Sequence, residues 1–386
     1  MSNFTESEER QELRRQVARL ASGYGRDWFV ERARSGEKTT ELWMEIAKAG
    51  YLGINVPEEY GGGGGGIGDV AAVCEELAAQ GCPLLMMVVS PAICGTVIAR
   101  YGTEDQKQRW LPGICDGTAT MAFAITEPDA GTNSHNITTT ARRDGDSWVL
   151  NGRKVYISGV DEAANVLVVA RAEDARTGKL KPCLFVVPTD APGFEFTAIA
   201  MEIVSPEKQF QVFIDDVRLP ADALVGDEDG GLVQLFAGLN PERIMAASFS
   251  TGLARHALGK AAAYAKERTV FQAPIGAHQA VAHPLATAHI ETELARLMTQ
   301  KASALVDAGD DLAAGEAANM AKYAAAEAAV HAVDAAVQTH GGNGITQEYG
   351  MAGLLVAARA GRIAPVSREM ILNFVAMHSL GLPKSY

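Results

Sequence analysis

Two segments that follow predicted strands carry groups able to bind a flat, electron-rich ligand. Residues 123–132 (FAITEPDAGT) leave a strand and turn through Pro128 and Gly131, which presents backbone N–H groups and threonine hydroxyls. Residues 152–159 (GRKVYISG) place Tyr156 two residues before Ser158, an aromatic platform beside a hydroxyl. Either segment alone is equally typical of an ordinary strand end. Together they favour a site for a ring system.

The common motifs of other enzyme classes are absent from the sequence. It contains no GxxxxGK[ST], HExxH or GxSxG pattern and no cysteine pairs spaced for zinc. The spacing of His278, His283 and His289 does not repeat one helical face, so we expect no metal site. The glycine run at residues 61–66 follows Pro57 and a polar stretch, not a buried strand, which predicts a flexible loop instead of a phosphate cradle.

Composition excludes several classes of partner. The 386 residues carry 47 acidic and 34 basic side chains, a net charge of −13 that repels nucleic acid and anionic membrane surfaces. No run of eighteen apolar residues predicts a membrane span, and the N-terminus lacks a signal or transit pattern. Five cysteines, an odd number without a CxxC pair, indicate a reducing compartment. We therefore expect a cytoplasmic protein.

The elements that must position these segments fall into three domains, which we place at residues 1–115, 116–225 and 226–386. In the first, apolar steps of three and four residues predict an amphipathic helix over residues 5–34. Further helices are predicted from Thr40 to residue 49, from an N-cap at Asp69 to residue 80, and over residues 92–101 and 106–114. The first domain is therefore expected to be all-helical.

The middle domain has a period of two, which is typical of strands. These are predicted at residues 120–126, 137–142, 148–151, 165–170, 183–187 and 212–214, separated by turn residues. The helical period then returns, with long helices predicted over residues 241–268, 280–308 and 312–339, and a last one near 367–380. Asn240 and Pro241 are typical of an N-cap and a first helical position, which would put Glu242 in a first turn.

These segments, with residues 101–107 (YGTEDQK) and 338–344 (QTHGGNG), resemble the acyl-CoA dehydrogenase family over essentially the whole chain. The resemblance implies an α+β fold with an N-terminal all-α domain, a middle antiparallel β domain and a C-terminal four-helix bundle. It also implies FAD as cofactor, an acyl-CoA substrate and an electron-transfer flavoprotein as acceptor. The expected assembly is a homo-oligomer, a dimer of dimers.

The resemblance carries site residues onto this sequence. The residues implied to bind FAD are Phe123, Ile125, Thr126, Thr132, Tyr156, Ser158, Arg268, Phe271, Gln279, Gln338, Gly341, Gly342 and Ser367. Of these, Arg268, Phe271, Gln279 and the 338–342 segment match parts that reach the FAD of a neighbouring subunit. Thr132 and Arg243 are implied to bind substrate. From the sequence alone, Arg268 would be a cation at a helix end and Gly341 a helix cap.

The position at which many relatives carry the catalytic glutamate is Pro365 here. A thioester dehydrogenase needs a carboxylate to remove the α-proton, and proline cannot supply one. Glu369 matches an additional glutamate of the relatives and is a weak candidate. Glu242 matches the base of a minority that resembles isovaleryl-CoA and long-chain enzymes, so we expect Glu242 to be catalytic. Its alternative role is plain helix capping.

The loss at Pro365 keeps other functions open. The same fold and flavin could serve an oxidase, a monooxygenase or a desulfinase, or the protein could bind acyl-CoA without catalysis. Val356 stands where relatives commonly have arginine, and residues 202–208 depart from their usual pattern, so subunit or substrate contacts are expected to differ. The sequence does not give the acyl chain length, and short branched chains are favoured only by analogy.

Overall fold

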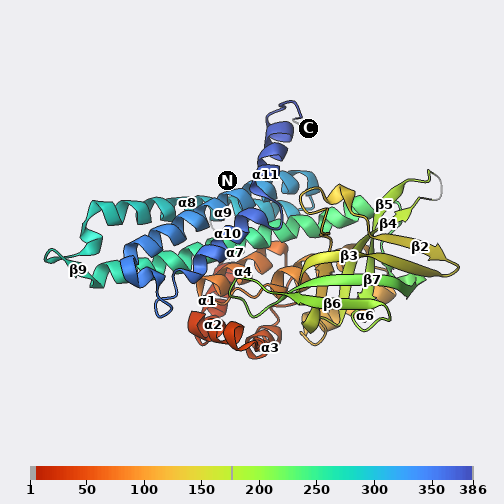
Figure 1. Cartoon of the computed structure of the whole chain (residues 1–386), viewed down its shortest axis with the longest axis horizontal. Helices are drawn as coiled ribbons and strands as arrows, with labels where there is room; N and C mark the ends of the chain where they lie inside the picture. Colours follow the sequence, from red (N-terminus) through yellow and green to blue (C-terminus); the bar gives the residue numbers. More distant parts are fainter. Residues whose placement is uncertain (1–5, 175–176, 385–386) are drawn as a thin grey trace.

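The computed structural model describes residues 6–174 and 177–384, and it has the α+β fold expected from the sequence. Helices α1–α4 lie under one side of a long C-terminal bundle, and the β domain, with α6 beside it, lies at one end of that bundle (Figure 1). The short hairpin β9–β10 lies at the opposite end (Figure 1). Among the described residues, no helix is long and apolar enough to cross a membrane.

The first helical stretch is two helices, not the single one predicted from residue 5, a residue outside the described part. The chain breaks at Gly23 and Tyr24, and Gly25 takes a positive φ of 77° that a continuous helix does not allow. The elements of this domain are α1 (Glu8–Ser22), α2 (Gly25–Ser35), α3 (Thr40–Lys48), α4 (Ile67–Ala79), the π-helical turn η2 (Val88–Gly95), α5 (Thr96–Tyr101) and α6 (Glu104–Cys115).

The glycine run is a mostly exposed loop that follows no strand, as predicted, and its backbone is hydrogen-bonded. Gly62, Gly63, Gly64 and Gly65 donate their N–H groups to backbone carbonyls of residues 53–57. A Cβ on Gly62 would lie 2.0 Å from the carbonyl oxygen of Val56, so the close approach requires glycine. The run ends in α4, where the N-cap is Gly66 and not Asp69. The Asp69 carboxylate instead accepts from the N–H of Gly66.

The β domain is one twisted sheet in the order β6-β7-β3-β2-β4-β5-β8, with β1 paired to β4. Most pairs are antiparallel, as the alternating pattern indicates, but β1–β4 and β2–β4 are parallel. The strands are β1 (Met121–Ala124), β2 (Thr140–Asp144), β3 (Ser147–Ser158), β4 (Asn165–Glu173), β5 (Leu180–Pro188), β6 (Phe194–Ile199), β7 (Gln209–Pro220) and β8 (Leu224–Val225). Strand β3 runs longer than predicted and includes Tyr156 and Ser158.

The bundle consists of α7 (Gly231–Glu267), α8 (Gln279–Asp307), α9 (Asp311–His340), α10 (Gly353–Ile363) and α11 (Arg368–Phe374), the last followed by a π-helical turn, Val375–Ser379. Helix α7 begins at Gly231, ten residues before the start predicted at Pro241, so the predicted N-cap at Asn240 was wrong. Pro241 lies inside the helix, and Glu242 is therefore not in a first turn. Burial and neighbouring charges, not the helix dipole, must set its protonation.

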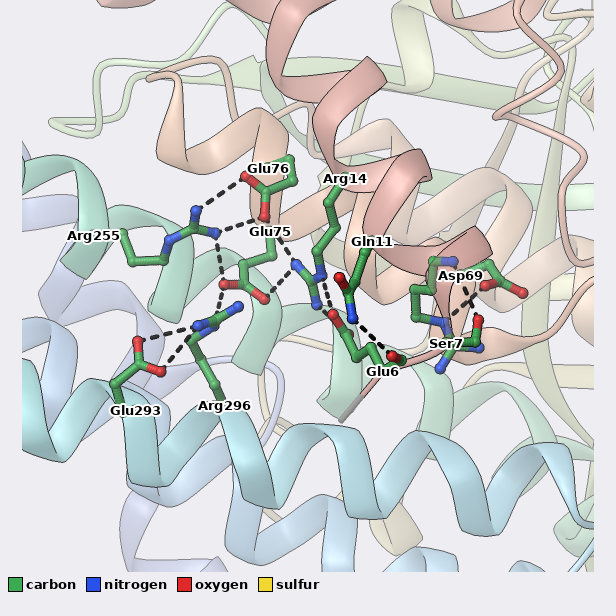
Figure 2. Close-up of polar contacts among 11 residues, drawn as sticks. Glu6, Ser7, Gln11, Arg14, Asp69, Glu75, Glu76, Arg255, Glu293 and Arg296 are labelled. Carbon is green, nitrogen blue, oxygen red and sulfur yellow. Dashed lines mark hydrogen bonds and ion pairs between the residues drawn. The ribbon is translucent and has the colours of Figure 1, made fainter. Parts of the chain in front are cut away.

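A buried ion cluster joins the first domain to the bundle (Figure 2). Glu75 on α4 forms ion pairs with Arg14 of α1 (2.9 Å), Arg255 of α7 (2.7 Å) and Arg296 of α8 (2.6 Å). Glu76 shares Arg14 and Arg255 at 2.9 and 2.8 Å. Burial raises the pKa of Glu75, but the three arginines outweigh it and hold that pKa below its ordinary value. Four helices are thus held together by charge as well as by packing.

Candidate active site

The two segments singled out in the β domain lie side by side. The N–H of Val155 on β3 donates to the carbonyl of Thr126, just after β1, at 2.9 Å. Phe123 is buried on β1, and Ile125 and Thr126 are partly exposed at the strand end. The structure therefore brings together the residues that the sequence placed two dozen positions apart, and it does so through a backbone contact between their segments.

A buried ion pair that the sequence analysis did not single out joins the same segments. Lys154 and Glu127 are both almost fully buried, with Nζ 2.9 Å from the glutamate Oε1 and 3.0 Å from the carbonyl of Ile125. Glu127 also accepts from the N–H groups of Thr138 and Thr139. Burial raises the pKa of Glu127, but Lys154 and these donors lower it by more, so that the net pKa is about 2. The sequence signal that could have identified this pair was the presence of two opposite charges within segments of apolar, strand-like pattern.

Tyr156 is the most exposed aromatic residue of this end of the sheet. Its ring is 59% exposed, and its φ of 58° is unusual for a residue other than glycine. Ser158 lies two residues on, and its hydroxyl exchanges hydrogen bonds with the Gln209 side chain. Thr132 is exposed in the loop after β1. The strand end thus presents an uncovered ring with hydroxyl groups beside it.

Glu242 lies next to this region, across the turn η2. The Cys94 thiol of η2 donates to the carbonyl of Ala122 on β1 at 3.5 Å, and the same thiol interacts electrostatically with Glu242 on α7. One turn before Glu242, Gly238 packs on Ile93 of η2. The turn η2 therefore lies between the β1 segment and the Glu242 carboxyl.

The environment of Glu242 keeps its carboxyl poised near neutrality. Burial raises its pKa to about 7, while Arg243 and Lys322 pull in the opposite direction. Arg243 donates to the Asn240 side chain at 3.1 Å, its guanidinium lies over the ring of Phe236, and its Nε has no partner among the described residues. A carboxyl with such a pKa can exchange a proton at neutral pH.

The segment that contains Pro365 lies between α10 and α11, and Lys322 of α9 connects it to the surroundings of Glu242. The buried ammonium of Lys322 donates to the carbonyl of Val366 at 2.5 Å. Pro365 is exposed, and the Glu369 side chain is 72% exposed on α11, so neither provides a buried carboxylate. Ser367 caps α11, accepting from the N–H of Met370. Sequence reasoning missed Lys322, although a lone lysine within the alanine stripe of α9 was a visible signal.

The remaining predicted residues gather at the other end of the bundle. Arg268 ends α7, about 40 Å from Glu242 along the helix axis at ~1.5 Å per residue, near β9 in Figure 1. Phe271 is 89% exposed and has a positive φ of 51°. The turn after α9 is tied to this end because Asn343 donates to the Tyr264 hydroxyl at 3.1 Å. Arg268, Phe271, Gln279, Gln338, Gly341 and Gly342 therefore do not meet the β-domain residues within one protomer.

The donor groups of the two regions fit FAD. The β-domain region offers an exposed ring and hydroxyls, which suit an isoalloxazine ring and its polar edge. The far end offers the cation of Arg268, two glutamine amides and the side-chain-free Gly341 and Gly342, which suit a pyrophosphate and a sugar. Tyr156 and Phe271 both hold strained positive φ values, a feature that concentrates at ligand sites.

Comparison with protein families covers nearly the whole chain. The model of the acyl-CoA dehydrogenase N-terminal domain matches residues 7–118, that of the middle domain residues 122–217, and that of the C-terminal domain residues 229–380.

Individual relatives and solved structures are similar over most of their length. Acyl-CoA dehydrogenase FadE12 of Mycobacterium tuberculosis is 66% identical over 100% of this chain and 99% of that protein. The long-chain specific acyl-CoA dehydrogenase of Sus scrofa is 33% identical over 90% of this chain and 81% of its own length. Butyryl-CoA dehydrogenase of Megasphaera elsdenii superposes with a TM-score of 0.91 at 27% identity, covering 98% and 99% of the two chains. A glutaryl-CoA dehydrogenase of Mycobacterium smegmatis in complex with FADH2 gives 0.89 at 27%, covering 99% and 96%.

Proposed function

The chain belongs to the acyl-CoA dehydrogenase family and is an FAD-dependent oxidoreductase that acts on acyl-CoA, and we propose that Glu242 is its catalytic base. The observation that carries this proposal is the pairing of a poised carboxyl at Glu242 with proline at position 365, where many relatives carry the base. Proline offers neither a carboxylate nor a backbone N–H. One base is needed, and Glu242 is the carboxyl that lies beside η2 and β1.

In the proposed reaction, ionised Glu242 takes the α-proton of the thioester. FAD, when bound, would supply the two-electron oxidant for loss of the β-hydride, so that the acyl chain would gain an α,β double bond. Burial makes the Glu242 carboxylate a stronger base than a solvated glutamate, and Arg243 stabilises the ionised form before the proton arrives. Because the free pKa is about 7, a large fraction of the enzyme is ready to act at neutral pH.

Arg243 is proposed to bind the thioester end of the substrate. Its guanidinium is held over Phe236 and by Asn240, which leaves Nε free to donate within the described structure. Thr132, exposed beside the strand end, is proposed to contact both substrate and FAD. The other β-domain residues, Phe123, Ile125, Thr126, Tyr156 and Ser158, are proposed to line the flavin ring, and Ser367 to lie against the same cofactor.

The FAD site is proposed to be completed by a second copy of the chain. Arg268, Phe271, Gln279, Gln338, Gly341 and Gly342 lie at the opposite end of the bundle, so they can reach FAD only in a neighbouring protomer. We accordingly propose a homo-oligomer, a dimer of dimers, with domains at residues 1–115, 116–225 and 226–386. An electron-transfer flavoprotein is the proposed acceptor, and the proposed location is cytoplasmic, consistent with five free cysteines.

The second candidate function is a flavoenzyme of the same fold with another reaction, or an acyl-CoA binder. The specific observation in its favour is proline at position 365, which the family resemblance matches to the usual position of the base. An oxidase or monooxygenase would reoxidise rapidly in air, and a binder would not reduce its flavin at all.

The test is an anaerobic titration of the purified yellow protein with short, branched, long and aromatic acyl-CoAs, following the absorbance of oxidised flavin. The proposal expects bleaching by one class of thioester, which also names the substrate. A spectral shift without bleaching by any thioester would reject dehydrogenation and favour the binder. Bleaching followed by fast recovery in air would favour the oxidase or monooxygenase.

A further inference from the structure

Lys322 occupies an unusual place for a charged side chain. It lies on the face of α9 that packs on α7, within a stripe of alanines, and only 1% of its surface is exposed. Its ammonium donates to the carbonyl of Val366, the residue after Pro365. Just before this segment, Gly361 packs between Ser250 of α7 and Ala326 of α9, so the chain crosses both helices close to Lys322.

The charges around Lys322 tie it to Glu242. The groups that face Glu242 are Arg243 on α7, Lys322 on α9 and the buried thiol of Cys94 on η2. Lys322 in turn faces Arg243 and the carboxylates of Glu369, Glu327 and Glu242. Burial and Arg243 lower the pKa of Lys322 to about 8, which leaves its ammonium mostly charged at neutral pH. Lys322 is thus a buried cation that α9 places within electrostatic reach of the Glu242 carboxyl on α7, and its direct partner in the described structure is the Val366 carbonyl.

We propose that Lys322 is a positioning residue for the reaction: its charge favours the ionised form of Glu242, and its hydrogen bond fixes the backbone of residues 364–366 against the site. This inference rests on the proposed role of Glu242 as the base. A lysine is suited to both tasks because its long stem crosses the helix contact while its head carries charge and three donors. No step of the reaction passes through Lys322 itself.

Four variants of the holoenzyme separate charge from hydrogen bonding. Lys322→Met removes both, Lys322→Gln removes the charge but keeps a donor, and Lys322→Arg keeps the charge. Lys260→Met makes the same change at an exposed position of α7 and is the matched control. The protonation of Glu242 is read directly from the infrared band of its protonated carboxyl across pH, identified as the band that Glu242→Gln removes.

The pH at which the Glu242 band falls to half of its full intensity is the titration midpoint. This midpoint should rise by about half a pH unit or more in Lys322→Met and Lys322→Gln, because loss of a nearby cation disfavours the carboxylate. It should stay within about 0.2 unit in Lys322→Arg and Lys260→Met. The flavin reduction rate at pH 6.5 should fall about threefold or more in the two neutral variants and recover at pH 9 at least in Lys322→Gln.

A midpoint that does not move in Lys322→Gln would overturn the inference, even if Lys322→Met does not fold. A uniform loss of rate at every pH, with an unmoved midpoint, would also overturn it by showing a purely structural lysine. The base assignment fails by a different result: rapid flavin reduction in Glu242→Gln. The two failures are therefore distinguishable.

Discussion

Glu242 has a burial cost that is consistent with its proposed role as the catalytic base. Its pKa is about 7 in the folded chain, against roughly 4.3 for an unfolded glutamate. For an acid with a raised pKa, the cost to folding is absent below the unfolded value and fully present above the folded value. An ionised carboxylate in this environment therefore destabilises the protein at the pH at which it works, a trade of stability for function.

Replacement of Glu242 by glutamine should thus stabilise the protein in a pH-dependent way. We expect Glu242→Gln to raise the free energy of unfolding by up to about 3 kcal/mol at pH 8 and by much less at pH 5. Urea unfolding at both pH values measures the difference, and Glu369→Gln, an exposed carboxyl, is the control. An equal effect at both pH values would mean that Glu242 is not a buried, titrating group.

The roles of individual site residues stay predictions. Glu242 was selected through the family resemblance, because the usual position of the base is Pro365, and Tyr156 and Ser158 were selected by their spacing at a strand end. Lys322 and the Lys154–Glu127 pair were not found, because their importance depends on burial by segments distant in sequence. A charge inside an apolar or alanine stripe is the signal that such pairs leave.

At the scale of elements, local signals failed where tertiary packing overrode them. Asn240 and Pro241 have the chemistry of a helix start, yet α7 continues through them because residues before Asn240 pack on η2 and β5. The glycine run has the composition of a flexible loop and is mostly exposed, yet its backbone N–H groups are hydrogen-bonded to the turn before it. Long periodic helices and the β region were predictable, because their patterns extend over many residues.

The segment that replaces the usual base cannot simply take the role back. Proline fixes its own φ, and Lys322 holds the carbonyl of Val366, so a new side chain at position 365 has a constrained backbone. We expect the double variant Glu242→Gln, Pro365→Glu to recover less than about 1% of the wild-type flavin reduction rate. Rapid-mixing reduction with FAD content as control checks this, and substantial recovery would show an adaptable segment.

The ion cluster between α1, α4, α7 and α8 should be a major source of stability. Glu75→Gln removes the carboxylate with which three arginines pair. Removal of one partner of a buried ion pair lowers the free energy of unfolding by about 3–5 kcal/mol. Glu293→Gln, which removes a half-exposed partner of Arg296, should cost less than about 1 kcal/mol. Urea unfolding compares the two.

The pKa of Glu75 is lowered, so its contribution to stability is present above the ordinary pKa of glutamate and is lost as pH falls through the folded value. The difference in the free energy of unfolding between wild type and Glu75→Gln should therefore become smaller at acidic pH. Equal stability losses for the two variants at pH 7 would show that the cluster contributes no more than a surface pair.

At the scale of the whole molecule, the account requires a second copy of the chain. Helix α8 carries exposed Ile290, Leu294 and Leu297, a stripe at four- and three-residue steps. Such a stripe on a water-facing helix is typical of an interface. The sequence pattern alone does not distinguish a core face from an interface face. The stripe indicates an interface because its side chains are exposed in the structure.

Disruption of this stripe should cause both dissociation of the oligomer and loss of FAD. We expect Leu294→Glu to lower the assembly state and the FAD content together, because Arg268 and Phe271 would no longer reach a neighbouring site. Light scattering after gel filtration and the flavin-to-protein absorbance ratio measure the two, and Leu312→Glu, an exposed leucine outside the stripe, is the control. Full FAD content in a monomeric variant would contradict a shared site.

The most direct test of the central claim is anaerobic rapid-mixing reduction of the FAD in wild type and in Glu242→Gln, with the thioester that bleaches the wild type. We expect normal FAD content and at least about a thousandfold slower reduction in the variant, because glutamine cannot take the α-proton that Glu242 is proposed to remove. A rate within about tenfold of wild type would show that the proton leaves by another route and that Glu242 is not the base.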